Sequence, residues 1–234
     1  MIREAIVLAG GLGTRLKSAV PDLPKCLAPV AGKPFLEYLI RDGKKQGVNR
    51  FIFALGYKTE LVENFVRTIL TESEYVFSVE QEPLGTGGAI YLACCQAGGQ
   101  DALVLNADTF FHVDLHQLSH FHAERKADCS LSLKPMKHFD RYGVVELNER
   151  QLITGFSDRR FMESGLINGG VYALNTGNFL SKTFPPAFSF EKDYLEKEYP
   201  TGKIYGMISD AYFIDIGIPE DYHRAQTELI QHIS

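Results

Sequence analysis

The chain has 234 residues, of which 45% are hydrophobic and 23% are charged, proportions that exclude an extensively disordered protein. Its formal net charge of -5 excludes a non-specific nucleic-acid binder, because that function needs a dense basic surface. The length fits one α/β domain with a single core, so we expect one domain over residues 1–234.

Neither the cysteines nor the apolar segments indicate secretion or insertion into a membrane. The apolar run at residues 5–9 is too short for a signal peptide, and no stretch of about 18 apolar residues occurs. The cysteines form no CxxC pair, and we expect them to be reduced: Cys26, Cys94, Cys95 and Cys129. We therefore expect a cytoplasmic protein without a nucleic-acid or membrane partner, and the sequence leaves homo-oligomer formation open.

Residues 1–110 alternate strand-like and helix-like runs, which is typical of βαβ units and a mostly parallel sheet. The expected strands cover residues 4–9, 50–55, 75–80 and 102–106. The expected helices cover residues 35–46, 59–70 and 87–96, where apolar residues recur at helical spacing. We therefore predict a doubly wound first half.

Longer strand-like segments dominate the second half, and they predict a mixed sheet. The expected elements are strands at residues 128–134, 143–147 and 167–174, and helices at residues 114–124 and 221–233. Pro219 suits the first turn of the last helix, whose apolar face we expect to pack onto the core. No linker or repeat interrupts the chain, so a boundary near positions 110 to 130 would separate subregions of one domain.

A glycine-rich loop follows the first expected strand. Its candidate nucleotide-binding residues are Leu8, Ala9, Gly10, Gly11, Gly13, Thr14, Arg15 and, farther on, Lys25. Glycines let the backbone approach a ligand and point N–H groups at anionic oxygens, and the two cations add positive charge. The loop therefore predicts a cradle for a triphosphate; the alternative is a glycine-rich turn with ordinary surface cations.

Two common glycine motifs do not fit this loop. GxGxxG would require glycine at Leu16, and GxxxxGK[ST] occurs nowhere, which disfavours a Rossmann dehydrogenase and a P-loop kinase. Instead, GGLGTRL at residues 10–16 followed by PKCLAPV at residues 24–30 resembles the signature of sugar-1-phosphate nucleotidylyltransferases. The resemblance implies an α/β fold of the nucleotidyltransferase (GT-A-like) type, a single Rossmann-like, three-layer domain with a mixed sheet. Residues 1–110 would bind the nucleotide and residues 111–234 the sugar.

Other segments resemble the base-binding and metal-binding motifs of that family. EQEPLGTGGA at residues 80–89 resembles the base-binding loop, whose glycines would let a flat base lie against the backbone. This assigns Gly85 and Thr86 to the nucleotide; a simple strand-to-helix turn is the alternative. Asp108 follows a hydrophobic strand and matches the family's metal ligand, and Asp215 in IDIG at residues 214–217 would complete the site. The resemblance thus implies Mg²⁺ as the cofactor.

Glu80 begins the segment that resembles the base-binding loop, four residues before Leu84, at a position where guanylyltransferases of the family tend to carry glutamate. Guanine presents two neighbouring donors, N1–H and the N2 amine, that one carboxylate can accept, whereas N1 of adenine carries a lone pair. We therefore expect Glu80 to favour GTP over ATP. In the alternative, backbone groups of residues 84–87 select the base and Glu80 only ends a strand.

INGGVY at residues 167–172 and FSFEKD at residues 188–193 resemble the family's sugar-binding motifs. The sugar-phosphate-binding residues implied by the resemblance are Gly143, Arg159, Asn168, Glu191 and Lys192. Ser189 has the alternative role of a helix cap. Arg159 stands where many relatives carry a lysine that holds the sugar phosphate, and Arg160 is a rival for that role.

Four histidines lie close together in the sequence: His112, His116, His120 and His122. His116 and His120 have an i,i+4 spacing that occurs in zinc sites, but no carboxylate motif accompanies them. We interpret the histidines as part of a solvated helix face.

The resemblance implies transfer of a nucleoside monophosphate, with GMP from GTP favoured over other NTPs, to a sugar 1-phosphate with release of pyrophosphate. Arg15, Lys25 and Asp108 would be the catalytic residues, since Arg15, Lys25 and the Mg²⁺ held by Asp108 would neutralise charge as two anions meet. KPMKHFDRYG at residues 134–143, together with INGGVY, FSFEKD and FIDIGIPEDY, looks most like D-glycero-D-manno-heptose 1-phosphate guanylyltransferases. The alternatives are a mannose-1-phosphate guanylyltransferase, another NDP-sugar pyrophosphorylase, and a catalytically silent nucleotide-sugar-binding subunit.

Overall fold

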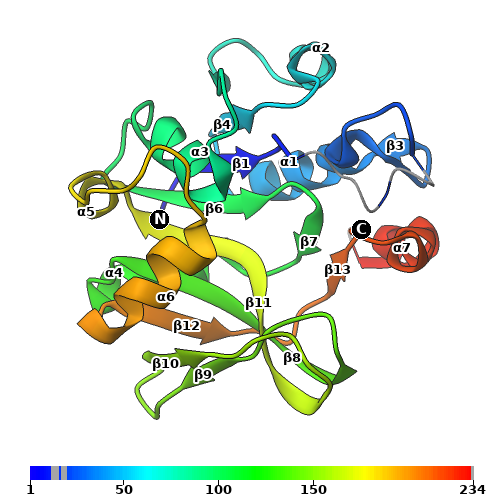
Figure 1. The fold of residues 1–234 in the computed structure, drawn as a ribbon. Helices are drawn as coiled ribbons and strands as arrows, with labels where there is room; N and C mark the ends of the chain where they lie inside the picture. The colour runs from blue at the N-terminus through cyan, green and yellow to red at the C-terminus, as the bar shows by residue number, and fades with distance from the viewer. Residues whose placement is uncertain (12–15, 17–19, 233–234) are drawn as a thin grey trace.

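The structure is a computed structural model that describes residues 1–11, 16 and 20–232 (Figure 1). At its centre lies a seven-stranded sheet with the strand order β12-β8-β11-β6-β1-β4-β5. The strands are β1 (Glu4–Leu8), β4 (Arg50–Leu55), β5 (Tyr75–Val79), β6 (Asp101–Asn106), β8 (Cys129–Phe139), β11 (Met162–Asn175) and β12 (Ile204–Ile208). β11 runs antiparallel to β6 and β8, whereas the other neighbouring strands are parallel. The predicted mixed sheet is confirmed.

Helices cover both faces of this sheet, because successive strand residues point to opposite sides and both sides are apolar. Val7 and Phe53 belong to one core cluster, and the intervening Ile6 and Ile52 belong to the other. The first cluster contains residues of α1 (Phe35–Lys45), α2 (Thr59–Ile69), α4 (Leu115–Arg125) and α7 (Pro219–His232). The second contains residues of α3 (Gly85–Cys94), α5 (Thr176–Leu180) and the short helix η3 (Phe190–Leu195), which α6 (Glu196–Glu198) continues. The fold is therefore a three-layer α/β domain, as predicted.

Short strand pairs outside the main sheet bring distant segments together. β13 (Phe213–Asp215) pairs antiparallel with β7 (Thr109–Phe111), so that Asp215 lies opposite Thr109. The other pairs are β2 (Pro29–Val30) with β3 (Lys33–Pro34), and β9 (Val145–Leu147) with β10 (Ile153–Phe156). Two short helices, η2 (Lys25–Leu27) and η4 (Tyr199–Thr201), lie between these elements in the chain. The β7–β13 pair returns the last part of the chain to the end of β6.

β8 and β11 are longer than the sequence predicts. The strand expected at 128–134 extends to Phe139 as β8. The strand expected at 167–174 already begins at Met162 as β11. The added residues form a two-stranded ribbon that projects away from the helices (Figure 1), and many of their side chains reach solvent. Hydrophobic alternation therefore does not mark them. The expected strand at 143–147 is limited to β9, and the sequence does not predict β10.

The four cysteines are free, and Cys95 is the exposed one among them. Burial raises the pKa of the Cys26 and Cys94 thiols to about 12, which keeps them protonated. Within the described part of the chain, each helix is too short or too polar to cross a lipid bilayer.

The histidines on and near α4 do not share one environment. His122 is 2% exposed, and its Nδ1 lies 3.0 Å from Ser130 Oγ. The interpretation as a solvated residue is wrong for His122, because this face of α4 packs against β8. Among residues 1–11, 16 and 20–232, no group of three or more His, Cys, Asp or Glu side chains is arranged to hold a metal ion.

Candidate active site

A cavity of about 620 Å³ lies at the carboxyl edge of the parallel strands. Because β1, β4, β5 and β6 run in one direction, the segments that follow them meet at this edge. The cavity is lined by the predicted nucleotide-binding residues Leu8, Ala9, Gly10, Gly11, Lys25, Glu80, Gly85, Thr86 and Asp108. The other three, Gly13, Thr14 and Arg15, lie outside the described residues.

Gly10 lies against the turn that follows β4. A Cβ atom on Gly10 would stand 3.0 Å from the backbone nitrogen of Gly56, whereas one on Gly11 would meet no atom of the described residues within 4 Å, its chain neighbours aside. Ala9 N donates to Ala54 O over 3.0 Å, which holds the start of the loop on β4. Gly10 therefore permits close packing of the loop, and none of the described residues closes the space beside Gly11.

Two aspartates that are distant in the sequence share one lysine beside this cavity. Lys25 Nζ lies 2.6 Å from Asp108 Oδ2 and 3.7 Å from Asp215 Oδ1. Asp108 follows β6, and the β7–β13 pair carries Asp215 beside it, where Ile216 N donates to Asp108 O over 3.0 Å. The structure thus brings together the two residues that the sequence assigns to the metal.

The environment of Asp215 favours a nearby positive charge. Burial raises the pKa of Asp215, and the negative charge of Asp108 raises it further, while Lys25 and a hydrogen bond from Gly217 N at 2.6 Å oppose the shift. Two carboxylates that converge on one ammonium group form a site for a cation. Mg²⁺ prefers oxygen ligands and is usually held by one or two carboxylates plus substrate phosphates. The donor set of Asp108 and Asp215 fits this ion.

Arg141 and Tyr142 contact Asp215 at its other oxygen. The Tyr142 hydroxyl donates to Asp215 Oδ2 over 3.3 Å, and Arg141 Nη2 lies 3.8 Å from the same atom. Burial and the charge of Asp215 raise the pKa of Tyr142, so the phenol stays protonated as a donor. Sequence reasoning missed both contacts, because the only signal is the position of the two residues just before Gly143.

Asn168 and Glu191, two predicted sugar-binding residues, contact each other. Asn168 Nδ2 donates to Glu191 Oε1 over 3.2 Å and to Tyr172 OH over 2.8 Å. The Glu191 side chain is exposed to solvent yet surrounded by protein on most sides, so desolvation raises its pKa, and the charge of Arg159 opposes the shift. The structure therefore places Asn168, Glu191 and Arg159 in one region.

Two further residues of the predicted sugar site have local structural roles. Ser189 Oγ accepts a hydrogen bond from Lys192 N over 3.2 Å, which confirms the helix-cap role of Ser189. A Cβ atom on Gly143 would stand 2.3 Å from Ser157 O. Glycine is therefore required at position 143 by the close approach of two backbone segments.

Glu80 closes the loop that precedes α3. Its Oε2 accepts a hydrogen bond from Leu84 N over 3.1 Å, and a Cβ atom on Gly56 would stand 2.3 Å from its Oε1. Glu80 and Gly56 both line the cavity. Since each carboxylate oxygen has a second lone pair, Glu80 can hold the loop and still accept a hydrogen bond from a ligand.

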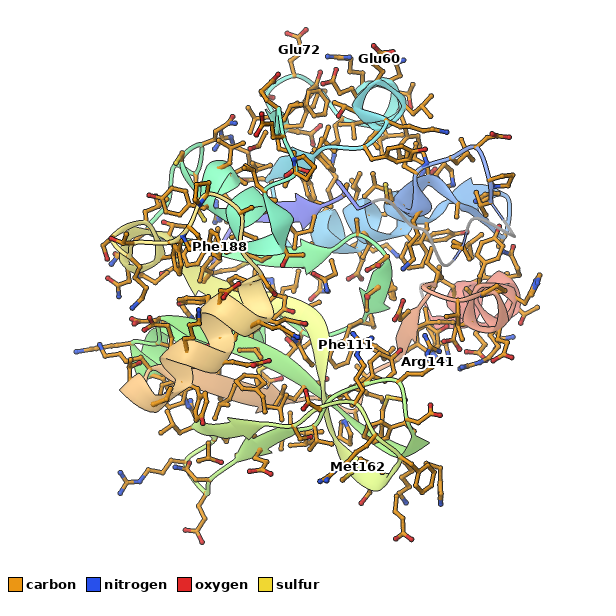
Figure 2. All side chains as sticks on the ribbon, in the orientation of Figure 1. Glu60, Glu72, Phe111, Arg141, Met162 and Phe188 are labelled. Carbon is orange, nitrogen blue, oxygen red and sulfur yellow. The ribbon has the colours of Figure 1, made fainter. Side chains whose placement is uncertain are left out.

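The start of α3 packs directly on the segment that precedes Glu191. A Cβ atom on Gly87 would stand 2.3 Å from the ring of Phe188, which lies beside α3 (Figure 2). Gly87 N donates to Phe188 O over 2.9 Å, and Thr86 Oγ1 accepts from Phe190 N over 2.9 Å. The sequence suggests that Gly87 makes room for a base; the structure instead shows that it makes room for Phe188.

Comparison with known proteins agrees with this arrangement. The family model described as "Nucleotidyl transferase" matches residues 4–232. The chain is 47% identical to D-glycero-alpha-D-manno-heptose 1-phosphate guanylyltransferase of Aneurinibacillus thermoaerophilus, over 98% of this chain and 100% of the relative. It is 43% identical to the protein of the same name from Campylobacter jejuni, over 94% of this chain and 97% of the relative.

A solved structure shares the fold along nearly the whole chain. The crystal structure of HddC from Yersinia pseudotuberculosis complexed with GMP-PN superposes with a TM-score of 0.86 at 35% identity, covering 97% of this chain and 100% of that chain. The match to the family, the two relatives and the shared fold all span nearly the full length. The chain therefore belongs to the nucleotidyl transferase family.

Proposed function

We propose that this protein transfers GMP from GTP to D-glycero-α-D-manno-heptose 1-phosphate and releases pyrophosphate. The observation that carries the proposal is the convergence of Asp108 and Asp215 on Lys25, which lines the cavity together with Asp108. A pair of carboxylates beside a nucleotide cavity can hold the metal ion that a reaction between two bound phosphates needs. The names of the relatives at 47% and 43% identity support the choice of both substrates.

In this proposal the cavity binds GTP. Its volume of about 620 Å³ lies within the usual range for small-molecule sites, roughly 300–1,000 Å³. The triphosphate would lie along the loop after β1 and against Lys25, with Gly13, Thr14 and Arg15 as further predicted contacts. Gly85, Thr86 and Glu80 would lie near the base, where Glu80 would accept hydrogen bonds from guanine.

The chemistry requires charge neutralisation more than proton transfer. A phosphate oxygen of the sugar 1-phosphate forms the new bond to the α-phosphorus, the bond to pyrophosphate breaks, and pyrophosphate leaves from the opposite side. The nucleophile is already an anion, so no general base is needed. Lys25 would offset charge at the transferring phosphate. Asp108 and Asp215 would hold Mg²⁺, which supplies further positive charge to the phosphates when it is bound.

Asn168 and Glu191 would bind hydroxyl groups of the sugar. Their mutual hydrogen bond fixes the amide of Asn168, and Gly170 N donates to Asn168 Oδ1 over 3.1 Å. The Glu191 carboxylate reaches solvent and can accept from hydroxyl groups. The heptose has one more carbon, with its hydroxyl group, than mannose. Specificity for the heptose would therefore arise in this region, where hydroxyl groups of the sugar are bound.

The test measures pyrophosphate release from GTP, ATP, UTP, CTP and dTTP, each paired with the 1-phosphates of the heptose, mannose and glucose, with Mg²⁺ or with EDTA. We expect the highest kcat/KM for GTP with the heptose 1-phosphate, and no turnover in EDTA. A higher kcat/KM for mannose 1-phosphate would favour the mannose alternative. If the folded protein releases no pyrophosphate with any pair of nucleotide and sugar 1-phosphate, the result would favour a catalytically silent subunit.

A further inference from the structure

The proposed function requires a cation that binds the phosphate of the sugar 1-phosphate next to the two aspartates. The candidates from the sequence are Arg159, Arg160 and Lys192. In the described part of the chain, however, the ion-pair partners of Asp108 and Asp215 are Lys25 and Arg141. Among the described residues, Arg141 is therefore nearer to the Asp215 carboxylate than any of the three candidates, none of which forms an ion pair with either aspartate.

Lys25 and Arg141 flank the carboxylate of Asp215 on its two oxygens. Lys25 Nζ lies 3.7 Å from Oδ1, and Arg141 Nη2 lies 3.8 Å from Oδ2. Lys25 lines the nucleotide cavity, whereas Arg141 belongs to the loop after β8 that leads to Gly143. The sugar phosphate has to approach the α-phosphorus of a nucleotide held beside Lys25, and Arg141 offers a second cation at the other oxygen of Asp215.

Arg141 has donors available for a phosphate. One terminal nitrogen pairs with Asp221, the other lies 3.8 Å from Asp215 Oδ2, beyond hydrogen-bond distance, and the side chain is 31% exposed. Figure 2 shows Arg141 between α7 and the ribbon formed by β8 and β11. Arg224 Nη1 lies 2.8 Å from the other oxygen of Asp221. Asp221 would therefore keep a partner if Arg141 turned toward a ligand.

We propose that Arg141 binds the phosphate of the sugar 1-phosphate, a role that rests on the proposed function of this site. A guanidinium group binds phosphate through two parallel hydrogen bonds, which a lysine in the same place cannot form. Lys25 would then serve the phosphate of the nucleotide, and Arg141 that of the sugar, on opposite sides of Asp215.

The experiment compares wild type with Arg141→Ala and Arg141→Lys in the GTP and heptose 1-phosphate assay. We expect Arg141→Ala to raise KM for the heptose 1-phosphate by about 10- to 100-fold, because one charge-assisted contact is lost, and to change KM for GTP by less than about two-fold. The KM of Arg141→Lys for the heptose 1-phosphate should lie between those of wild type and Arg141→Ala. The inhibition constant of the same heptose without its phosphate should not change, since that ligand makes no contact with Arg141.

Arg224→Ala is the matched control, because it removes the other cation of Asp221 without reaching Asp215. We expect KM for the heptose 1-phosphate to stay near the wild-type value in this variant. An equal rise in both variants would overturn the proposal, because it would indicate a structural role through Asp221. A selective rise in Arg159→Ala, Arg160→Ala or Lys192→Ala, with Arg141→Ala unchanged, would overturn it as well.

Calorimetric titration of the heptose 1-phosphate into enzyme that holds a non-hydrolysable GTP analogue gives a readout independent of turnover. Binding by wild type and a matching loss of affinity in Arg141→Ala would support the proposal even if no pyrophosphate is released, in which case the proposed function fails alone. Equal affinities, or no binding by wild type, would overturn the inference.

Discussion

The hydroxyl of Thr86 accepts a hydrogen bond from the backbone nitrogen of Phe190 over 2.9 Å, which joins the predicted base-binding loop to the predicted sugar-binding segment. A second link runs from Phe188 N to Leu84 O, also over 2.9 Å. Glu191 follows directly after Phe190. The two halves of the site are therefore mechanically connected, and a change in one should affect the other.

Thr86→Val tests this connection, because it keeps the shape of the side chain and removes the hydroxyl. The N–H of Phe190 would lose its acceptor, and water could not replace it because Phe190 is buried. We expect KM for the sugar 1-phosphate to rise between about 2- and 10-fold, and KM for GTP to rise as well. Thr86→Ser should behave as wild type. Unchanged kinetics with Thr86→Val would show that the link has no functional effect.

The proposed metal site predicts that Asp108→Asn and Asp215→Asn each remove most turnover while the protein stays folded, because an amide binds Mg²⁺ far less well than a carboxylate. Turnover should be measured across a range of Mg²⁺ concentrations, with circular dichroism as the check on folding. Near-normal activity of either variant at limiting Mg²⁺ would contradict a site that uses both aspartates.

The raised pKa of Asp215 predicts that Asp215→Asn, although it removes turnover, stabilises the fold in the absence of metal. Because the folded protein favours the protonated form, ionisation of Asp215 lowers the free energy of unfolding as the pH rises above the ordinary carboxyl range. In EDTA, Asp215→Asn should therefore have a higher Tm than wild type near pH 8, and the difference should shrink as the pH falls toward 4.

Asp210 provides the matched control for this measurement. The side chain of Lys134 lowers the pKa of Asp210, so its ionisation favours the folded state and the sign of the effect is reversed. Asp210→Asn should have a Tm equal to or below that of wild type near pH 8. A fall in Tm for Asp215→Asn at that pH would contradict the argument from its pKa.

Sequence reasoning located the parts of the site that are local in the chain. The glycines after β1 and the aspartate after β6 are visible because a hydrophobic strand and the residues just beyond it form one continuous signal. The neighbourhood of Asp108 and Asp215 was expected only from the family resemblance. Its physical cause is the β7–β13 pair, two strands of three residues that no periodicity reveals.

The contacts that depend on long-range packing were not predictable. Tyr142 reaches Asp215 across 73 positions of the chain, through a loop whose path is set by the β8–β11 ribbon. His122 also illustrates this, since only the packing of α4 on β8 shows that it points inward. A cytoplasmic location and the roles of individual site residues stay predictions.

Glu80 is the residue that we expect to set the choice of base. Glu80→Gln keeps an oxygen that can accept from Leu84 N, so the loop should persist while the negative charge is lost. If the carboxylate accepts N1–H and the N2 amine of guanine, its loss removes charge-assisted hydrogen bonds that contribute roughly 1.5–3 kcal/mol. The ratio of kcat/KM for GTP to that for ATP should then fall by about 10- to 150-fold.

Glu82→Gln is the control, because Glu82 also lines the cavity and carries the same charge close by in the chain. If general electrostatics set the nucleotide preference, both variants should lower the ratio equally. If backbone groups of residues 84–87 select the base, neither variant should change it, and the carboxylate hypothesis would be wrong. A fall confined to Glu80→Gln is expected only when that carboxylate pairs with guanine, since adenine offers a lone pair at the same position and gains when the charge is removed.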